Sequence, residues 1–340
     1  MGIRALALVA ALAAGQPPAP PVTERVEVVR VLIDARVLDR GDRPITGLTP
    51  ADFRVRIGGR PARVESAEWI GSTSLDALTS ASPAGAQPAD AGSEGRLIVF
   101  LVQKSLQHGR VGGLMQTLFE SGPFLQTFTP HDRLAVLSFD SHLNVWLDFT
   151  ADHDRVRQVL RHEILTGRAP SVVASGAPTL LPTLPSSRTR TMSSVEQALG
   201  GLADALYPLP GAKIVVVIGY GFGRASFSRD MSVATVAIDD YERIRQALQA
   251  ARATVFCLDI TEADYHTLEV GLQTVADDTG GFFERMFHFP ARSFARLSAA
   301  LSGHYVLFVE RPALGPGTHD IDVALTRRKG RVLARRHFEQ

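Results

Sequence analysis

Three stretches of the chain are apolar along almost their whole length, and they constrain the fold more than any other feature. They are Leu97–Val102, Lys213–Gly219 and Ala253–Ile260. A strand without apolar–polar alternation is buried on both faces, as the central strands of a parallel sheet are. Apolar residues at helical spacing follow each stretch. The repeated strand–helix order therefore predicts an α/β domain with a doubly wound, mostly parallel sheet over residues 96–303.

The same domain has three further predicted features. Arg133–Phe139 and Leu143–Phe149 are joined by a short polar turn, so we expect an antiparallel hairpin. Phe282 and Phe283 begin a sixth strand. The segment 166–190 contains four prolines and little apolar periodicity, which predicts a mobile insertion.

Short β regions stand on both sides of this domain. Residues 24–70 and 304–340 contain alternating segments such as Phe53–Ile57, and neither region is long enough to bury a face alone. We therefore expect them to pack together as one small β-sandwich-like module. Residues 71–95 are rich in Ser, Ala, Gly, Pro and Asp, which indicates a flexible linker. The arginine-rich end, Arg327–Arg336, is expected to be the solvated face of a hairpin, although an acidic partner could dock there.

The first fifteen residues resemble a secretory signal. Arg4 precedes an apolar run from Ala5 to Leu12, and small residues follow at positions 13–15. The run is too short for a membrane anchor, which needs about 18 apolar residues. We expect an exported, periplasmic or extracellular protein without a membrane span.

Composition excludes several classes of function. The single cysteine rules out an internal disulfide framework, a cysteine-based zinc site and an iron–sulfur cluster. The formal net charge of +1 gives no global field for nucleic acid or an anionic membrane, so such a partner would need a local charged patch.

Motifs of catalysis are missing from the sequence. There is no Gly-x-Ser-x-Gly, no His-Glu-x-x-His, and the adjacent pair His162-Glu163 lies in a predicted helix without a second histidine one turn on. Cys257 lies inside an apolar strand, where a thiol acts as a small hydrophobe. The glycines of Gly219–Gly223 do not have dinucleotide spacing and indicate a turn. We expect no enzymatic activity.

Several segments resemble von Willebrand factor A (vWA) domains. Asp132–Ser141, followed by Asp148-Phe149-Thr150 and Asp152, is similar to the second and third strands and the following helix start of that family. Segments 41–53, 279–282 and 304–335 resemble the flanking regions of a secreted bacterial group, VWFA-related proteins. The resemblance covers nearly all of residues 25–338. It implies a Rossmann-like sheet of six strands, with the β module beside it.

The resemblance also implies where a metal site would lie. Such domains usually hold Mg²⁺ through an Asp-x-Ser-x-Ser loop, a later Thr or Ser, and an Asp after the fourth strand, and the metal accepts an acidic residue of a protein partner. Here the loop has Gln103, Ser105 and Gln107, with Lys104 inside it, and Tyr220 stands where the second Asp would be. Ser193 or Thr191 could offer the distal hydroxyl. Mg²⁺ prefers carboxylate oxygens, so we predict a degenerate metal-ion-dependent adhesion site without Mg²⁺ or another cofactor.

Three interpretations of this loss remain open. The first is a structural or metal-independent platform for protein interaction or adhesion, and we favour it. The second is a repurposed crevice in which Gln103, Ser105, Gln107, Ser193 and Tyr220 bind a ligand or support an enzyme, since strand ends of such sheets commonly bind ligands. The third is a metal site restored by an unforeseen carboxylate, such as Asp140 or Asp259.

Overall fold

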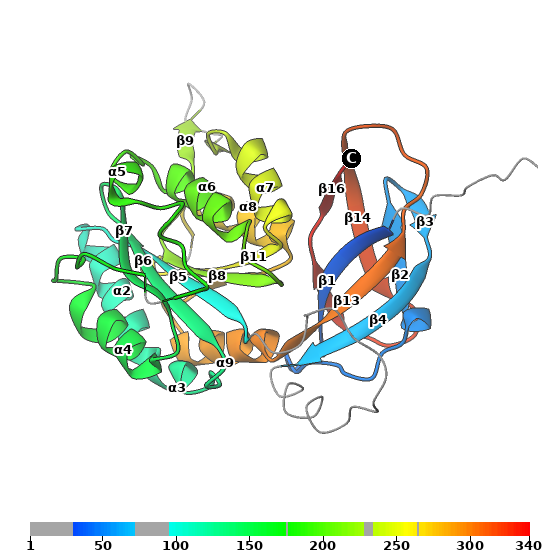
Figure 1. Cartoon of the computed structure of the whole chain (residues 1–340), viewed down its shortest axis with the longest axis horizontal. Coiled ribbons are helices and arrows are strands. Elements are labelled where there is room, and N and C mark those ends of the chain that lie inside the picture. Colours follow the sequence, from blue (N-terminus) through cyan, green and yellow to red (C-terminus); the bar gives the residue numbers. More distant parts are fainter. Residues whose placement is uncertain (1–29, 72–94, 175, 228–233, 264) are drawn as a thin grey trace, which may run out of the picture.

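The computed structural model describes residues 30–71, 95–174, 176–227, 234–263 and 265–340. Over these residues the chain forms an α/β domain and a β module that stand side by side (Figure 1). The signal-like segment 1–15 and nearly all of the expected linker 71–95 lie outside the described residues. Within the described residues, helices that are long and apolar enough to cross a membrane are absent.

The α/β domain is built on a six-stranded sheet with the strand order β12-β11-β8-β5-β6-β7. All neighbouring pairs are parallel except β6 and β7, which form the predicted antiparallel hairpin. This is the mostly parallel sheet that the vWA resemblance implies. Its strands are β5 (Leu97–Gln103), β6 (Arg133–Phe139), β7 (Leu143–Thr150), β8 (Lys213–Gly219), β11 (Ala253–Asp259) and β12 (Phe283–Arg285).

Helices cover both faces of the sheet, and β5 shows why the sequence requires this. Leu97, Val99 and Leu101 enter one apolar core, while Ile98 and Phe100 enter the other. The first core is covered by α6 (Val195–Leu206), α7 (Tyr241–Ala250) and α8 (Glu269–Thr279). The second is covered by α2 (His108–Glu120), α3 (Gly122–Leu125), α4 (His153–Gln158), the π-helix η2 (Val159–Glu163) and α9 (Pro290–Leu301).

The proline-rich insertion differs from the mobile loop that we expected. Leu180 and Leu184 are buried in the first core, and the short helix α5 (Ser186–Thr189) follows them. The Asp148 carboxylate accepts hydrogen bonds from the backbone N–H of Leu180, at 2.9 Å, and from the hydroxyl of Thr179. Two buried leucines and a carboxylate that caps the backbone therefore fix the second half of this segment to the domain.

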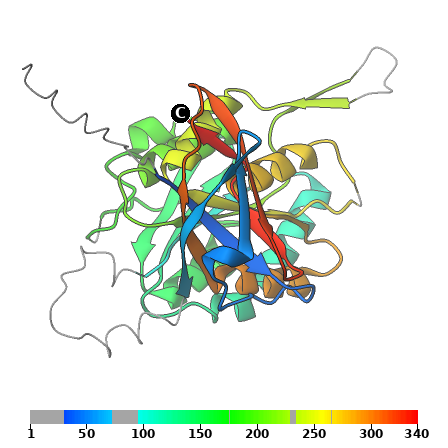
Figure 2. The same cartoon turned by 90° about the vertical axis from the view of Figure 1, so that its right-hand side faces the viewer.

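A small hairpin in the α/β domain was not predicted. Strands β9 (Arg224–Phe227) and β10 (Ala234–Ala237) pair with each other and not with the main sheet. Figure 2 shows this hairpin projecting from the domain. Its strands are short and only weakly apolar, so the sequence resembles a loop between β8 and α7.

The β module is a sandwich of two four-stranded sheets, as expected from the terminal regions. One sheet has the order β15-β1-β13-β4 and the other β16-β14-β2-β3. Ile33, Val55, Tyr305 and Leu307 belong to the core between them. The strands are β1 (Arg30–Leu38), β2 (Phe53–Ile57), β3 (Arg60–Ala62), β4 (Val64–Gly71), β13 (Gly303–Glu310), β14 (Thr318–Leu325), β15 (Arg331–Ala334) and β16 (His337–Glu339), and the 3-10 helix η1 (Pro50–Asp52) precedes β2.

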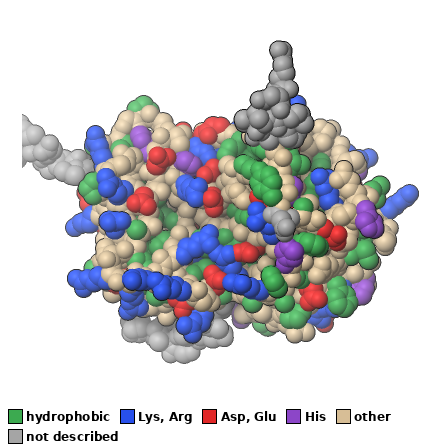
Figure 3. All heavy atoms as spheres, turned by 180° about the vertical axis from the view of Figure 1, so that it is seen from behind, with side chains coloured by type: hydrophobic (Ala, Val, Ile, Leu, Met, Phe, Trp, Pro, Cys, Tyr) green, Lys and Arg blue, Asp and Glu red, His purple; other side chains and the backbone are tan. Residues whose placement is uncertain are grey.

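The arginine-rich end is not a hairpin. β14 pairs with β2 in one sheet, whereas β15 pairs with β1 in the other, so the exposed connection 326–330 crosses between the sheets. The end is also only partly solvated, because Arg335 donates to the Leu32 carbonyl at 2.9 Å and Arg336 pairs with Asp277 at 2.8 Å. Figure 3 shows Lys and Arg side chains gathered over the sandwich half of the rear face, with acidic side chains among them.

The α/β domain is inserted into the sandwich between two paired strands. Gly71, at the end of β4, is the register partner of Gly303, at the start of β13. Only Ser302 separates β13 from α9. A part-buried ion pair also joins the two parts, because Arg252 of the α/β domain forms a bidentate pair with Asp34 of β1, at 2.6 and 3.1 Å.

Candidate functional site

The three central parallel strands end at one edge of the sheet. β5 ends at Gln103, β8 at Gly219 and β11 at Asp259, and the loops that follow lie along this edge. Every residue of these three strands is buried, so the first accessible chemistry lies in their carboxyl-terminal loops.

Gln103 is used to hold the neighbouring loop. Its side-chain oxygen accepts hydrogen bonds from the backbone N–H groups of Tyr220, at 3.0 Å, and Gly221, at 3.3 Å. The residue is 3% exposed. Gly219 makes room for this contact, since a Cβ there would lie 2.7 Å from the same oxygen. The amide therefore closes the position where the vWA resemblance places a metal-binding carboxylate.

The other predicted crevice residues do not converge. The Ser105 hydroxyl accepts from the backbone N–H of Gln107 at 3.2 Å, so these two residues form a local turn. Ser193 lies before α6, where its hydroxyl and N–H contact the Gln197 side chain at 3.3 and 2.9 Å. Among the described residues, hydrogen bonds between Ser193 and Gln103 or Ser105 are absent. Hydrogen bonds thus join Gln103 to the backbone of Tyr220 and Ser105 to the backbone of Gln107, in two separate pairs.

Two cations flank a fully exposed leucine in the loop after β5. The Leu106 side chain is 100% exposed. The Arg110 guanidinium lies 3.9 Å from the centre of the Tyr220 ring, and the Lys104 ammonium lies 5.8 Å from the Trp146 ring. Both distances are within the range of cation–π attraction, which holds the two charges in place. We call residues Lys104–Arg110 the docking loop.

The two acids that could have restored a Mg²⁺ site have other partners. Asp140 accepts from the backbone N–H of Ser141, at 2.5 Å, and from its hydroxyl, at 3.2 Å. Burial opposes ionisation of Asp140, but the hydrogen bonds from Ser141 and the charge of Lys104 outweigh it and lower its pKa below the ordinary value. Asp259 is directed to His266. The positions where the resemblance implies Mg²⁺ ligands therefore offer amides, hydroxyls and a phenol beside an ammonium, which do not fit a hard dication.

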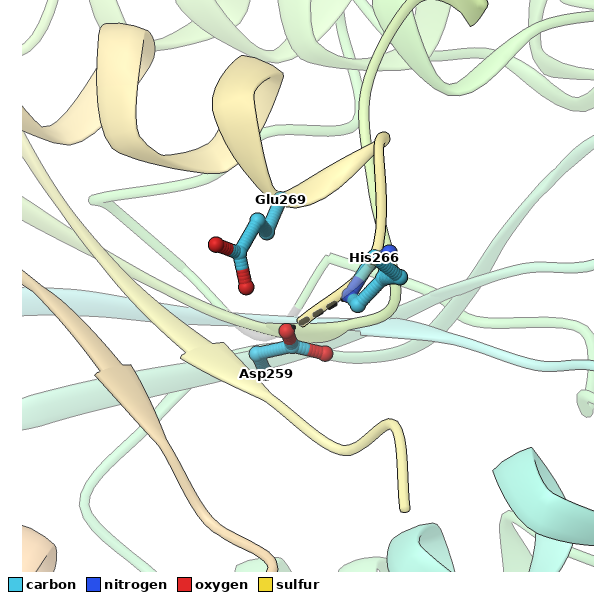
Figure 4. A group of neighbouring side chains, drawn as sticks. All are labelled: Asp259, His266 and Glu269. Atoms are coloured by element: carbon cyan, nitrogen blue, oxygen red, sulfur yellow. Dashed lines mark hydrogen bonds and ion pairs between the residues drawn. The ribbon is translucent and has the colours of Figure 1, made fainter. Parts of the chain in front are cut away.

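A second group of chemical side chains lies at the end of β11. Asp259 ends the strand, His266 lies in the loop that follows, and Glu269 is the first residue of α8. Figure 4 shows the three side chains directed toward one another. One potential ligand atom from each lies within 4.8 Å of the other two, and Asp259 and Glu269 are 1% and 2% exposed.

Each member of this cluster is held by a further contact. The Nε2 atom of His266 lies 2.7 Å from Oδ2 of Asp259, and the other Asp259 oxygen accepts from the Thr261 N–H at 2.9 Å. Arg285 of β12 forms a bidentate pair with Glu269 at 2.6 and 2.9 Å. The cluster is therefore a positioned set of one imidazole and two carboxylates.

The sequence contained a signal for this cluster that was missed. His266 and Glu269 are three residues apart, the spacing that places two side chains on one side of a helix start, and Asp259 follows an apolar strand. A search for two histidines one helical turn apart passes over this set. The metal-ligating pair was sought at His162-Glu163, but Glu163 instead pairs with Arg155.

The structure gives the other candidate motifs packing roles. Gly221 has a φ of 152°, and a Cβ there would lie 2.4 Å from the Cβ of Leu268, so this glycine serves a turn and a close approach. Cys257 is fully buried, and burial raises the pKa of its thiol. A neutral buried thiol is a poor nucleophile, which fits its expected role as a hydrophobe.

Comparisons with known proteins give only fold-level likenesses. No family model matches the chain, and no curated protein matches it either. Similar solved structures include BatB from Bacteroides thetaiotaomicron, at 14% identity over 61% of this chain and 98% of that one, with a TM-score of 0.39. Another is a von Willebrand factor type A protein from Catenulispora acidiphila, at 12% identity over 86% and 75% of the two chains, with a TM-score of 0.40. PTMP1 from the mussel byssus, with a zinc-occupied MIDAS motif, is 10% identical over 65% and 49%, with a TM-score of 0.40. At these values the likenesses carry no argument about function, and the description of the fold rests on the strand order.

Proposed function

We propose that this chain is an exported protein-interaction module that binds an acidic segment of a protein partner at the docking loop, without Mg²⁺. The observation that carries the proposal is Leu106, a fully exposed apolar side chain between two positioned cations. An exposed leucine alone is ordinary. Its place at the strand-end edge, between Lys104 and Arg110, is what favours a binding role.

Charge complementarity suggests the chemistry of the partner. Arg110 stacks on the Tyr220 ring and Lys104 lies near the Trp146 ring, and the Lys104 charge also acts on the Asp140 carboxyl. In proteins that the sequence resembles, a metal ion accepts an acidic residue of the partner. Here an ammonium and a guanidinium would supply the positive charge, and Leu106 would contact an apolar side chain beside the acid. We expect such binding to weaken as salt screens the charges.

The proposal assigns no catalysis to this edge. A hydrolytic or transfer reaction needs a nucleophile, a base and a stabilising donor within hydrogen-bond reach of one another. The Gln103 oxygen is committed to two backbone N–H groups, and Ser105 to Gln107. These commitments favour a binding surface over an active site.

A peptide-display selection tests the proposed function. The immobilised full chain is exposed to a random peptide library, and the enriched sequences are compared with those selected by the triple variant Lys104→Glu, Leu106→Ala, Arg110→Glu. We expect the natural chain to enrich peptides with Asp or Glu next to an apolar residue, and the variant to lose them. Adding Mg²⁺ should leave the enrichment unchanged.

A matched control separates this loop from exposed surface in general. Phe119 and Tyr207 are 67% and 64% exposed and lie elsewhere on the domain, so the double variant Phe119→Ala, Tyr207→Ala should select the same peptides as the natural chain. Enrichment of the same peptides by the triple variant would contradict the proposal, as would selection that requires Mg²⁺.

Export is a separate part of the proposal and has its own measurement. It is supported by the signal-like sequence of residues 1–15. Expression of the full chain in a Gram-negative host should yield a periplasmic or secreted product whose amino terminus begins near residues 14–16. Recovery of the protein from the cytoplasm with an intact amino terminus would contradict export. It would not affect the docking proposal, which the peptide selection tests.

A further inference from the structure

The geometry points to a divalent transition-metal site formed by Asp259, His266 and Glu269 at the end of β11. This inference goes beyond the proposed docking function and uses different residues. It uses none of the positions where the vWA resemblance implies Mg²⁺ ligands, which follow β5 and β8, because its residues lie at the end of β11, in the next loop and at the start of α8.

The ligand atoms are already close to the spacing that an ion needs. Zn²⁺ sites are usually tetrahedral, with bonds to nitrogen and carboxylate oxygen of about 2.0–2.2 Å, so two ligand atoms of one ion lie roughly 3.3–3.6 Å apart. The three potential ligand atoms here lie within 4.8 Å of one another. Nε2 of His266 and Oδ2 of Asp259 are 2.7 Å apart, so these two atoms would have to separate to seat an ion between them. It would take the place of the proton shared by Nε2 of His266 and Oδ2 of Asp259.

The donor set selects the class of ion. Imidazole nitrogen favours Zn²⁺ and related transition ions over Mg²⁺, which prefers an all-oxygen shell. One histidine and two carboxylates suit Zn²⁺ and also Mn²⁺. Three protein ligands leave at least one coordination position for water or for an atom of a bound molecule.

Contacts around the cluster hold its ligands in a binding orientation. Arg285 fixes Glu269 through both carboxylate oxygens, each of which keeps a second lone pair, and the Thr261 N–H fixes Asp259. Such outer contacts orient the first ligands in metal sites. In addition, the Thr261 hydroxyl is buried and lacks a hydrogen-bond partner among the described residues, so a polar group beside the cluster is left unsatisfied.

Charge balance also favours a cation. With a neutral imidazole, the two carboxylates and the Arg285 guanidinium sum to −1, and both carboxylates are almost fully buried. Buried carboxylates are costly unless a cation or hydrogen bonds compensate them. Asp259 is compensated by hydrogen bonds with Thr261 and His266, and Glu269 by Arg285, and a dication would balance the charge that remains.

Calorimetric titration of the full chain with Zn²⁺, and separately with Mn²⁺, tests the inference. We expect one ion per chain. The variants His266→Gln and Asp259→Asn should bind at least about 100-fold more weakly, because loss of outer contacts alone typically costs 10–100-fold. His162→Gln is the matched control, since His162 is exposed and belongs to the same domain. The docking-loop variant Lys104→Glu, Leu106→Ala, Arg110→Glu should bind the ion like the natural chain, so failure of one proposal is distinguishable from failure of the other.

A spectroscopic readout on the natural chain keeps the test decisive if a variant does not fold. Mn²⁺ is paramagnetic and broadens the NMR signals of nearby nuclei. After sequential assignment, the imidazole signals of His266 should broaden at substoichiometric Mn²⁺, well before those of His162. Absence of stoichiometric binding by either ion would overturn the inference, as would equal affinity in His266→Gln or broadening that spares His266. The three residues would then be an ion-pair cluster only.

Discussion

The ends of β5 and β11 lie at one edge of one sheet, yet their side chains are used in opposite ways. At β5 the Gln103 side chain accepts hydrogen bonds from two backbone N–H groups of the adjacent loop. At β11 a carboxylate, an imidazole and a second carboxylate face one another. The position in the fold is shared, so the difference comes from residue type. The Gln103 amide accepts hydrogen bonds from backbone donors and so fills its end of the sheet. At β11, an imidazole and a carboxylate share one proton, and a cation can replace that proton.

The largest change in the free energy of unfolding should come from Gly113, which lies where α2 contacts the end of β11. Gly113 of α2 lies against the end of β11, and a Cβ there would be 1.8 Å from the Ile260 carbonyl oxygen. Because that neighbour is backbone, Gly113→Ala should lower the free energy of unfolding by about 3 kcal/mol. Chemical denaturation measures this.

Gly109 in the same helix is the matched control for that substitution. The nearest atom to a Cβ there is 4.0 Å away, so Gly109→Ala should change stability by less than about 1 kcal/mol. Equal effects of the two substitutions would mean that α2 and the end of β11 are not in the close contact described.

The second largest effect should be the stabilisation of the fold by a bound metal ion, which should differ between the ends of β5 and β11. If Zn²⁺ binds at β11, a free concentration one hundred times the dissociation constant adds about 2.7 kcal/mol to the free energy of unfolding. Mg²⁺ should add nothing comparable at β5. Thermal unfolding with each ion measures both effects. Stabilisation by Mg²⁺ that disappears in Ser105→Ala would reverse the comparison.

Removing the amide at β5 should have a smaller cost. Gln103→Leu leaves one buried and one part-buried N–H group without this acceptor, which we expect to cost about 2 kcal/mol. Gln107→Leu is the control, because Gln107 is exposed and its side chain does not cap α2. Urea unfolding of the two variants compares them, and similar midpoints would refute the capping role of Gln103.

The smallest effect concerns the first charged residue of the docking loop, Lys104. The Lys104 charge helps to lower the pKa of Asp140. A folded-state pKa below the ordinary value stabilises the fold above that ordinary value, and the contribution is lost as the pH falls through the folded-state pKa. Lys104→Met should therefore raise the Asp140 pKa and reduce this acid-dependent loss.

An NMR titration of the Asp140 carboxyl measures that change, with Arg110→Met as the control. Arg110 is not among the charges that shift Asp140, so its removal should leave the titration unchanged. Identical titrations in all three proteins would show that Lys104 does not act on Asp140.

Much of the fold could be predicted because the pattern of apolar residues along a segment indicates which of its faces are buried. Runs such as Leu97–Val102 exclude water from both faces, and alternation in Phe53–Ile57 fits a sandwich. Features that depend on three-dimensional partners were missed. The β9–β10 hairpin has no apolar signature, and the assignment of β14 and β15 to opposite sheets is set by their pairing with β2 and β1.

The candidate site, like the fold, could be predicted only in part. Replacement of the expected acids by Gln103 and Tyr220 was visible in the sequence, but the use of the amide to hold the β8 loop depends on Gly219 leaving space for it. The β11 cluster combines a strand end, a loop and a helix start. In the sequence these residues do not form a recognisable motif, and only the fold brings Asp259 into contact with His266.

The pairing of Gly71 with Gly303 has a consequence for how this chain can be divided. Where the polypeptide leaves the sandwich and where it returns are hydrogen-bonded neighbours, so a tight turn could join them as an ordinary hairpin. A gene that replaces residues 72–302 with such a turn should encode a self-contained sandwich of eight strands, once Leu38 and Leu333, which pack in the second core of the α/β domain, are replaced by polar residues. The α/β domain is thus an insertion that leaves and re-enters the sandwich at two neighbouring points.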